Sequence, residues 1–147
     1  MFKFRLAKIL SLKEKMEEAK KNEYGKAKKK LDDAIEKKNA LVKKKDDLVN
    51  EMKSLDGSVE LLKRRNEYNK YINYLKEVIQ KLESNIQILR MEAEIKRKEL
   101  EEAVKERKVL DKFKEKEFEK YKKEEQRIEN NFVNELVSYR FTVKEEE

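Results

Sequence analysis

Apolar residues recur every three or four positions through the second half of the chain. With Ile72 at heptad position a, ten of the twelve a and d positions as far as residue 110 are apolar. Isoleucine at a and leucine at d are typical of helices that pack knobs-into-holes against a partner helix. The pattern therefore predicts a coiled coil, with these residues at its interface: Ile72, Leu75, Ile79, Leu82, Ile86, Leu89, Ala93, Lys96, Leu100, Ala103, Arg107 and Leu110.

The first half of the chain shows the same period with weaker residues, and Lys38 and Lys45 interrupt it. We expect these lysines, like Lys96 and Arg107, to set the register of the interface or to extend past it into solvent. After Leu110 the apolar positions change phase but continue, which alters a supercoil without ending the helix. Both halves should therefore form long helices.

Turn-forming residues gather at residues 54–58, in the sequence Ser-Leu-Asp-Gly-Ser. Gly57 tolerates the left-handed conformation that ends helices, and Ser58 is a good N-cap for a following helix. A second place for the bend is Asn66 to Asn69, where two asparagines interrupt the pattern. Gly25, inside a helical run, should only weaken its helix, by about 1 kcal/mol.

The predicted fold class is all-α, with two long helices in an antiparallel coiled-coil hairpin. Residues 1–141 form one domain, which has a helix over residues 3–54, a bend at residues 55–59 and a longer helix over residues 58–140. Residues 142–147 are expected to be a disordered acidic tail.

The longer second helix would overhang the first and expose large apolar residues that need a partner. The residues expected on this overhang are Phe118, Tyr121, Phe132, Leu136 and Tyr139. Three tyrosines near the bend, Tyr68, Tyr71 and Tyr74, follow one another at helical spacing. They either cap the hairpin tip or anchor a partner, and both interpretations are open.

The composition excludes most other classes of protein. Charged residues make up 48% of the chain, and it has two glycines and no proline, cysteine, histidine or tryptophan. So few turn-formers cannot supply the corners of a sandwich, a barrel or a Rossmann sheet. Without cysteine, histidine or a glycine-rich phosphate loop we expect no enzyme, no metal and no cofactor.

The net charge of +7 is concentrated in the first half, where residues 1–56 carry 17 basic and 11 acidic residues. Lysine and arginine runs at residues 26–30, 43–45 and 63–65 could bind nucleic acid or another anionic surface. Arginine is scarce and acidic residues are interleaved, which favours solvated helix faces with local ion pairs. No stretch is apolar enough to span a membrane and no secretory signal is evident, so the chain is expected to be cytoplasmic.

Three segments stand out as motifs: the opening FKFRLAKILSLKEKMEEAK at residues 2–20, YINYL with VIQKLE at residues 71–83, and EQRIENNFVNEL at residues 125–136. These three segments resemble the FliJ family of flagellar export proteins. Asn134 and Glu135 stand where members of the family often have Asp-Glu. Length and order match over essentially the whole chain.

The resemblance implies a non-enzymatic two-helix coiled coil, similar in shape to the central stalk of rotary ATP synthases. Such a protein would work at the inner face of the cell membrane, binding the hexameric flagellar export ATPase, the cytoplasmic domain of the export gate, and export chaperones. The paired helix ends would enter the ATPase ring, through Phe2, Phe4, Leu6, Phe132, Leu136 and Tyr139. The gate would bind early in the second helix, at Val78, Leu82, Asn85 and Leu89.

Two alternatives to this coupling protein are open. One is a basic coiled-coil module that binds nucleic acid or an anionic surface. The other is a generic homodimeric coiled-coil spacer.

Overall fold

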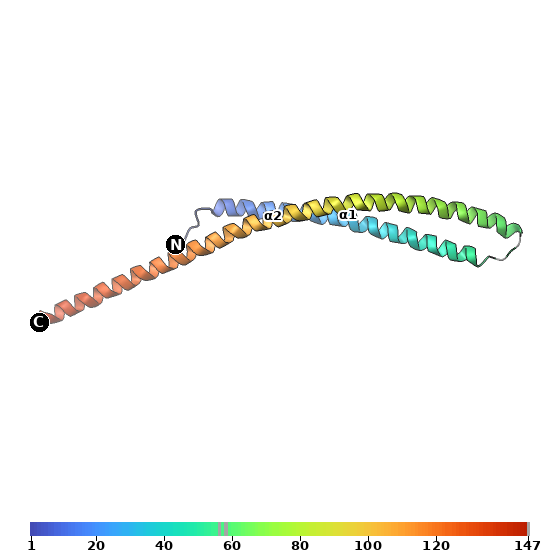
Figure 1. The fold of residues 1–147 in the computed structure, drawn as a ribbon. Helices are drawn as coiled ribbons and strands as arrows, with labels where there is room; N and C mark the ends of the chain where they lie inside the picture. The colour runs from blue at the N-terminus through green and yellow to red at the C-terminus, as the bar shows by residue number, and fades with distance from the viewer. Residues whose placement is uncertain (56, 58, 147) are drawn as a thin grey trace. The chain divides into compact units, whose positions relative to one another are not determined.

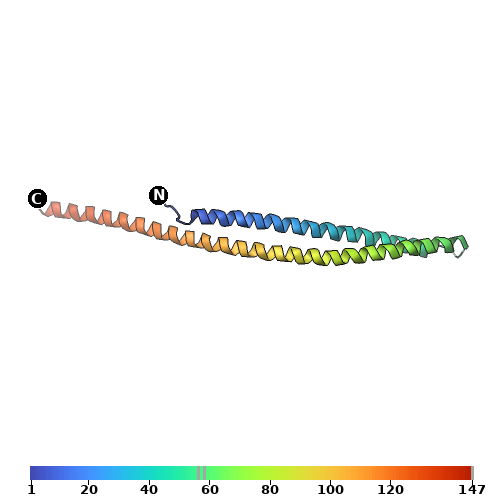
Figure 2. The same cartoon turned by 90° about the horizontal axis from the view of Figure 1, so that it is seen from above.

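The computed structural model describes residues 1–55, 57 and 59–146, and its two regular elements are long helices. Helix α1 spans Ala7–Lys53 and α2 spans Val59–Glu145. The contacts group into two units, one of residues 19–101 and one of residues 1–18 with 102–147. Within each unit the two helices contact each other in opposite directions (Figures 1 and 2). The predicted all-α hairpin with a longer second helix is confirmed.

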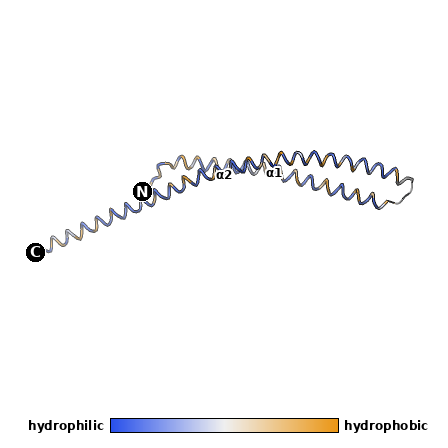
Figure 3. Tube along the Cα trace, in the orientation of Figure 1, coloured by the Kyte–Doolittle hydropathy of each residue, from blue (hydrophilic) through white to orange (hydrophobic). Residues whose placement is uncertain are grey.

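The α1–α2 interface contains the residues that the heptad assignment predicts. All twelve a and d positions of α2 from Ile72 to Leu110 are buried or half-buried. Leu75 is the most covered, with 2% of its surface exposed. In Figure 3 the apolar residues recur as orange bands between hydrophilic stretches of both helices. A pair of helices has a single interface, so the 3.5-residue period alone decides which side chains are buried.

Three of the four polar residues expected at this interface bond to acidic side chains of the opposite helix, whereas Lys45 pairs with the adjacent Asp46 of its own helix. Lys38 Nζ lies 3.2 Å from Glu83 Oε1, and Lys96 Nζ lies 3.4 Å from Glu23 Oε2. In the unit that contains both chain ends, the Arg107 guanidinium pairs with the Glu17 carboxylate. Each of these three interhelical pairs joins one particular residue of α1 to one of α2, as expected for residues that set the register.

The first residues do not form the helix that was expected from residue 3. Helix α1 begins at Ala7, and the preceding segment places two phenylalanine rings on α2. The ring centres of Phe2 and Phe118 lie 5.2 Å apart, and those of Phe4 and Phe113 lie 5.9 Å apart. Residues two apart on a helix point in nearly opposite directions, so a helical start could not place both rings on one surface.

The chain reverses direction between Lys53 and Val59, where the bend was expected. Ser54 closes the end of α1, because its Oγ donates a hydrogen bond of 2.7 Å to the carbonyl of Glu51. The left-handed conformation expected of Gly57 stays a prediction, because its φ angle depends on Asp56. The alternative bend at residues 66–69 is wrong, since these residues lie inside α2. Asp56 and the predicted N-cap Ser58 lie outside the described residues.

The C-terminal end of α2 extends further than the predicted residue 140. The helix includes Thr142 to Glu145, which the sequence assigned to a disordered tail. Thr142 Oγ1 donates a hydrogen bond of 2.9 Å to the carbonyl of Ser138, one turn earlier. No glycine or proline follows Gly57 in the sequence, so nothing local ends the helix before its last turn. Glu147 lies outside the described residues.

Candidate functional site

The last part of α2, residues 122–145, is exposed at every position. Tyr121 is the last half-buried residue, and the centre of its ring lies 5.5 Å from the centre of the Phe2 ring. In both cartoon views the end of α2 extends beyond the N-terminal segment (Figures 1 and 2). Phe118 and Tyr121 were expected on the unpaired overhang, whereas both contact Phe2. We call residues 122–145 the unpaired segment.

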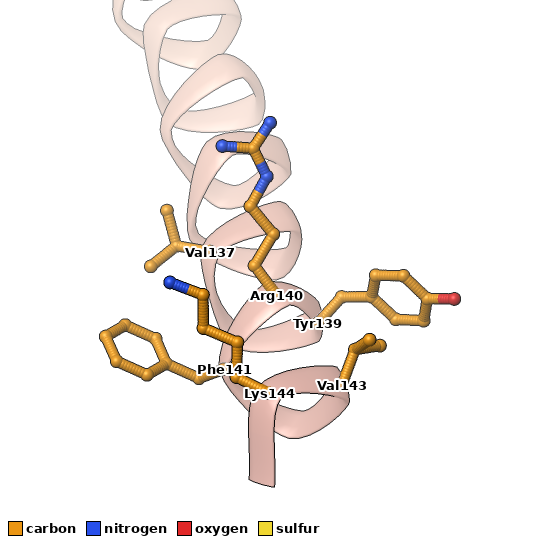
Figure 4. A pocket seen from close by; sticks show the side chains of 6 residues that line it. All are labelled: Val137, Tyr139, Arg140, Phe141, Val143 and Lys144. Carbon is orange, nitrogen blue, oxygen red and sulfur yellow. The ribbon is translucent and has the colours of Figure 1, made fainter. Parts of the chain in front are cut away.

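Large apolar side chains on the unpaired segment fall into two rows. At about 100° per residue, five of them fall within an arc of roughly 80°; we call this row the long stripe, and it contains Ile128, Phe132, Leu136, Tyr139 and Val143. Three more, which we call the short stripe, follow on the adjoining arc: Val133, Val137 and Phe141. Figure 4 shows Val137 and Phe141 on one side of the helix, with Tyr139 and Val143 on the other.

The hollow between these side chains is not a small-molecule cavity. Its volume is about 570 Å³, and all six of its lining residues come from one helical stretch, residues 137–144. The side chains point outward from the helix in Figure 4. Ligand pockets bury most of their ligand between walls. This surface is instead suited to a macromolecular partner.

Local side-chain bonds support the unpaired segment as a helix. Arg127 Nη2 lies 2.6 Å from Glu124 Oε1, and this pairing raises the pKa of Arg127 and lowers the pKa of Glu124. Tyr121 donates a hydrogen bond of 2.6 Å to Glu125, which raises the pKa of its phenol. Pairs three or four residues apart each stabilise a helix slightly without help from another chain.

Of the six residues that the resemblance assigns to the ATPase ring, the three near the chain start are covered and the three in the unpaired segment are exposed. Phe4 is buried, with 8% of its surface exposed, while Phe2 and Leu6 are half-buried. Phe132, Leu136 and Tyr139 are exposed, and the aromatic contacts of Phe2 and Phe4 lie at residues 113–121 instead. The N-terminal residues therefore hold the chain start on α2, and the C-terminal ones are accessible.

The four residues assigned to the gate are mostly turned towards α1. Val78, Leu82 and Leu89 are half-buried and Asn85 is exposed. On the opposite side of α2 lies an exposed apolar set that the sequence analysis missed, which we call the outward patch: Ile88, Met91 and Ile95. Its spacing of three and four residues, out of phase with the heptad positions, was the signal that could have revealed it.

Two of the three tyrosines near the bend join the two helices. Tyr68 donates a hydrogen bond of 3.3 Å to Glu51 of α1, and the Lys44 ammonium lies 5.4 Å from the centre of the Tyr71 ring. The rings of Tyr71 and Tyr74 stack with their centres 6.2 Å apart. Tyr68 and Tyr71 thus act within the hairpin, while Tyr74 is more than half exposed.

The basic runs lie on exposed helix surface. Lys28, Lys29 and Lys30 are exposed, as are Lys43 and Lys44. Residues 63–65 are exposed as well, and acidic side chains separate the three runs along the sequence. Binding of nucleic acid or another anionic surface stays a prediction.

The part of the chain that the structure describes contains no group of three or more acidic side chains placed to hold a metal ion. Neither α1 nor α2, within the described ranges, is apolar enough over a sufficient length to cross a membrane.

Comparison with known proteins identifies a family. The family whose sequence model matches this chain is described as "Flagellar FliJ protein", and the match covers residues 2–146. No curated protein and no solved structure matches the chain. Because the family match spans nearly all of the sequence, the chain belongs to the FliJ family of flagellar export proteins.

Proposed function

We propose that this protein is a non-enzymatic coupling protein of the flagellar export apparatus. It binds the hexameric export ATPase in the manner of a rotary-ATPase central stalk, and it links that ring to the cytoplasmic domain of the export gate and to export chaperones. In this role it acts at the inner face of the cell membrane. The proposal combines membership of the family with the surfaces described above.

The unpaired segment carries the proposal for the ATPase. Its long and short stripes together cover more than half of the helix circumference, at about 100° per residue. A helix that is apolar on most of its sides is normally buried on most of its sides. The central opening of a ring surrounds a helix in this way, whereas a flat docking surface covers only one face.

The N-terminal residues have a supporting role in this proposal. Phe2 and Phe4 pack against α2 at residues 113–121, so their rings are already covered. They fix the point on α2 where pairing stops and the accessible surface begins. In this proposal Phe132, Leu136 and Tyr139 contact the ring, and Phe2, Phe4 and Leu6 do not.

For the export gate we propose the outward patch together with Asn85. Ile88 follows Asn85 by three residues, so the two side chains are neighbours on the exposed face of α2. Met91 is 69% exposed, and methionine adapts to irregular partner surfaces. Val78, Leu82 and Leu89 contribute by holding α2 against α1, since all three are half-buried at the interface.

The test is co-purification with the export ATPase of the same organism, with the ATPase turnover rate as a second readout. We expect the wild-type chain to bind and to raise turnover. A charge in either stripe, Phe132→Glu or Val137→Glu, should weaken binding at least tenfold, because a carboxylate loses its hydration inside a ring.

The matched control is Asn131→Glu, which adds the same charge to the same helix at about 60° or more around the axis from every residue of both stripes. It should retain most of the binding. The coupling proposal fails if the wild-type chain neither binds the ATPase nor changes its turnover. In a parallel pull-down with the cytoplasmic domain of the gate, Met91→Glu should lose binding that Phe132→Glu retains.

A further inference from the structure

We propose that the unpaired segment pairs with the same segment of a second copy of this chain, in an antiparallel two-helix contact along the long stripe. This dimer would form in the free protein, and it does not depend on the proposed function. Two observations identify the second copy as the occupant, namely continuity with the existing interface and symmetry of the stripe, and the net charge of the segment opposes the contact only weakly.

The long stripe continues the face of α2 that already packs against the N-terminal segment. Tyr121 contacts Phe2 on this face, and Ile128 follows seven residues later, which brings it to nearly the same side of the helix. From Ile128 the steps of four, four, three and four residues keep to that side, as in a coiled-coil interface. The surface is thus a helix-pairing face that lacks its second helix within the described chain.

The spacing of the long stripe is nearly symmetrical about its own centre. The pairs Ile128 with Val143 and Phe132 with Tyr139 both have their midpoint between residues 135 and 136. Leu136 lies next to this midpoint. In an antiparallel pair of identical helices, each residue faces the one that is equally far beyond the two-fold axis. Every member of the stripe therefore faces another member or lies beside the axis.

Charge opposes this contact only weakly. Residues 122–147 carry five basic and seven acidic side chains, a net charge of −2 per copy. Two copies of the segment therefore repel each other little.

This contact covers the long stripe and leaves the short stripe open. An export ATPase ring that surrounds the helix would have to displace the second copy. The dimer would thus shield part of the apolar surface while the ATPase is absent.

Cysteine cross-linking tests the pairing, because the chain has no cysteine of its own. In full-length protein, Leu136→Cys should form a disulfide-linked dimer under mild oxidation, since the two positions lie beside the axis. An equimolar mixture of Ile128→Cys and Val143→Cys should cross-link between the two variants. Ile128→Cys alone should remain monomeric, because its two copies lie 15 residues apart along the contact, or about 22 Å.

A measurement of mass without oxidation completes the test. By sedimentation equilibrium the wild-type chain should shift with rising concentration from 17.8 kDa towards twice that mass. Leu136→Glu should weaken dimerisation at least tenfold, whereas Asn134→Glu and Val137→Glu should behave as wild type. Val137→Glu separates the two proposals, because it should impair ATPase binding and spare the dimer.

Three results would overturn the inference. The first is a mass of 17.8 kDa at all concentrations up to about 100 times that of the cross-linking assay. The second is efficient self-cross-linking of Ile128→Cys, which indicates parallel chains. The third is equal loss of dimer in Leu136→Glu and Asn134→Glu. None of these measurements contains the ATPase, so failure of the coupling proposal leaves the result unchanged.

Discussion

Two stretches of α2 carry similar apolar residues at similar spacing but differ completely in burial. In residues 72–93, Ile72 and Leu75 are 4% and 2% exposed, against 60% for Phe132 and 48% for Leu136 in the unpaired segment. Hydrophobic periodicity thus specifies a face of a helix but not what covers it. In the first stretch the partner is α1, and in the second the chain supplies none among the described residues.

The difference predicts that equivalent substitutions have different effects in the two stretches. Leu75→Ala should lower the free energy of unfolding by about 2–4 kcal/mol, because it removes a buried side chain from the interface between α1 and α2. Leu136→Ala should change it by less than about 0.5 kcal/mol, as is usual for exposed positions. Urea unfolding followed by circular dichroism, at concentrations where the chain is monomeric, measures both. Comparable losses would mean that the unpaired segment is covered in the monomer.

A smaller contrast concerns helix propensity. Gly25 lies in α1 with no positive φ, and a Cβ built there meets no atom within 4 Å. Gly25→Ala should therefore stabilise the hairpin by about 1 kcal/mol. Asn130→Ala makes a similar gain in propensity in the unpaired segment. Asn130→Ala should slow local hydrogen exchange in the unpaired segment and leave the urea midpoint unchanged. If it shifted the urea midpoint as much as Gly25→Ala does, the two stretches would contribute equally to the unfolding transition.

The smallest effect is a pH dependence. Lys20 Nζ on α1 lies 3.2 Å from Glu99 Oε2 on α2, and this hydrogen bond holds the pKa of Glu99 below its ordinary 4.5. The stabilisation is present above that value and is lost as the pH falls through the lower pKa of the folded state. The urea midpoint of wild type should thus fall more between pH 7 and pH 3 than that of Glu99→Gln.

Glu124 gives the matched control. Arg127 lowers its pKa too, but both residues lie on the unpaired segment. Glu124→Gln should leave the acid dependence of hairpin unfolding as it is in wild type. Equal responses of the two variants would show that the acid effect is general charge repulsion rather than pairing between the helices.

The sequence predicted the interface of α2 residue by residue, because burial on a two-helix coiled coil follows from the heptad alone. It did not predict the contacts of the first six residues. The ring contacts of Phe2 and Phe4 depend on which residues of α2 lie beside the chain start, and no local pattern in the sequence specifies this. The heptad pattern also did not predict the acidic partners across the interface, such as Glu17 and Glu83, because these residues lie outside the apolar positions. The outward patch was overlooked because its residues are out of phase with the stronger period.

The packing of Phe2 and Phe4 at residues 113–121 sets where the accessible part of α2 begins. A shift of this contact by seven residues towards the end of α2, or about 10 Å, would cover Ile128. Seven residues inserted in α1 and matched by seven in α2 would keep the same residues paired and the same stripe accessible, so insertions in this protein should occur in pairs.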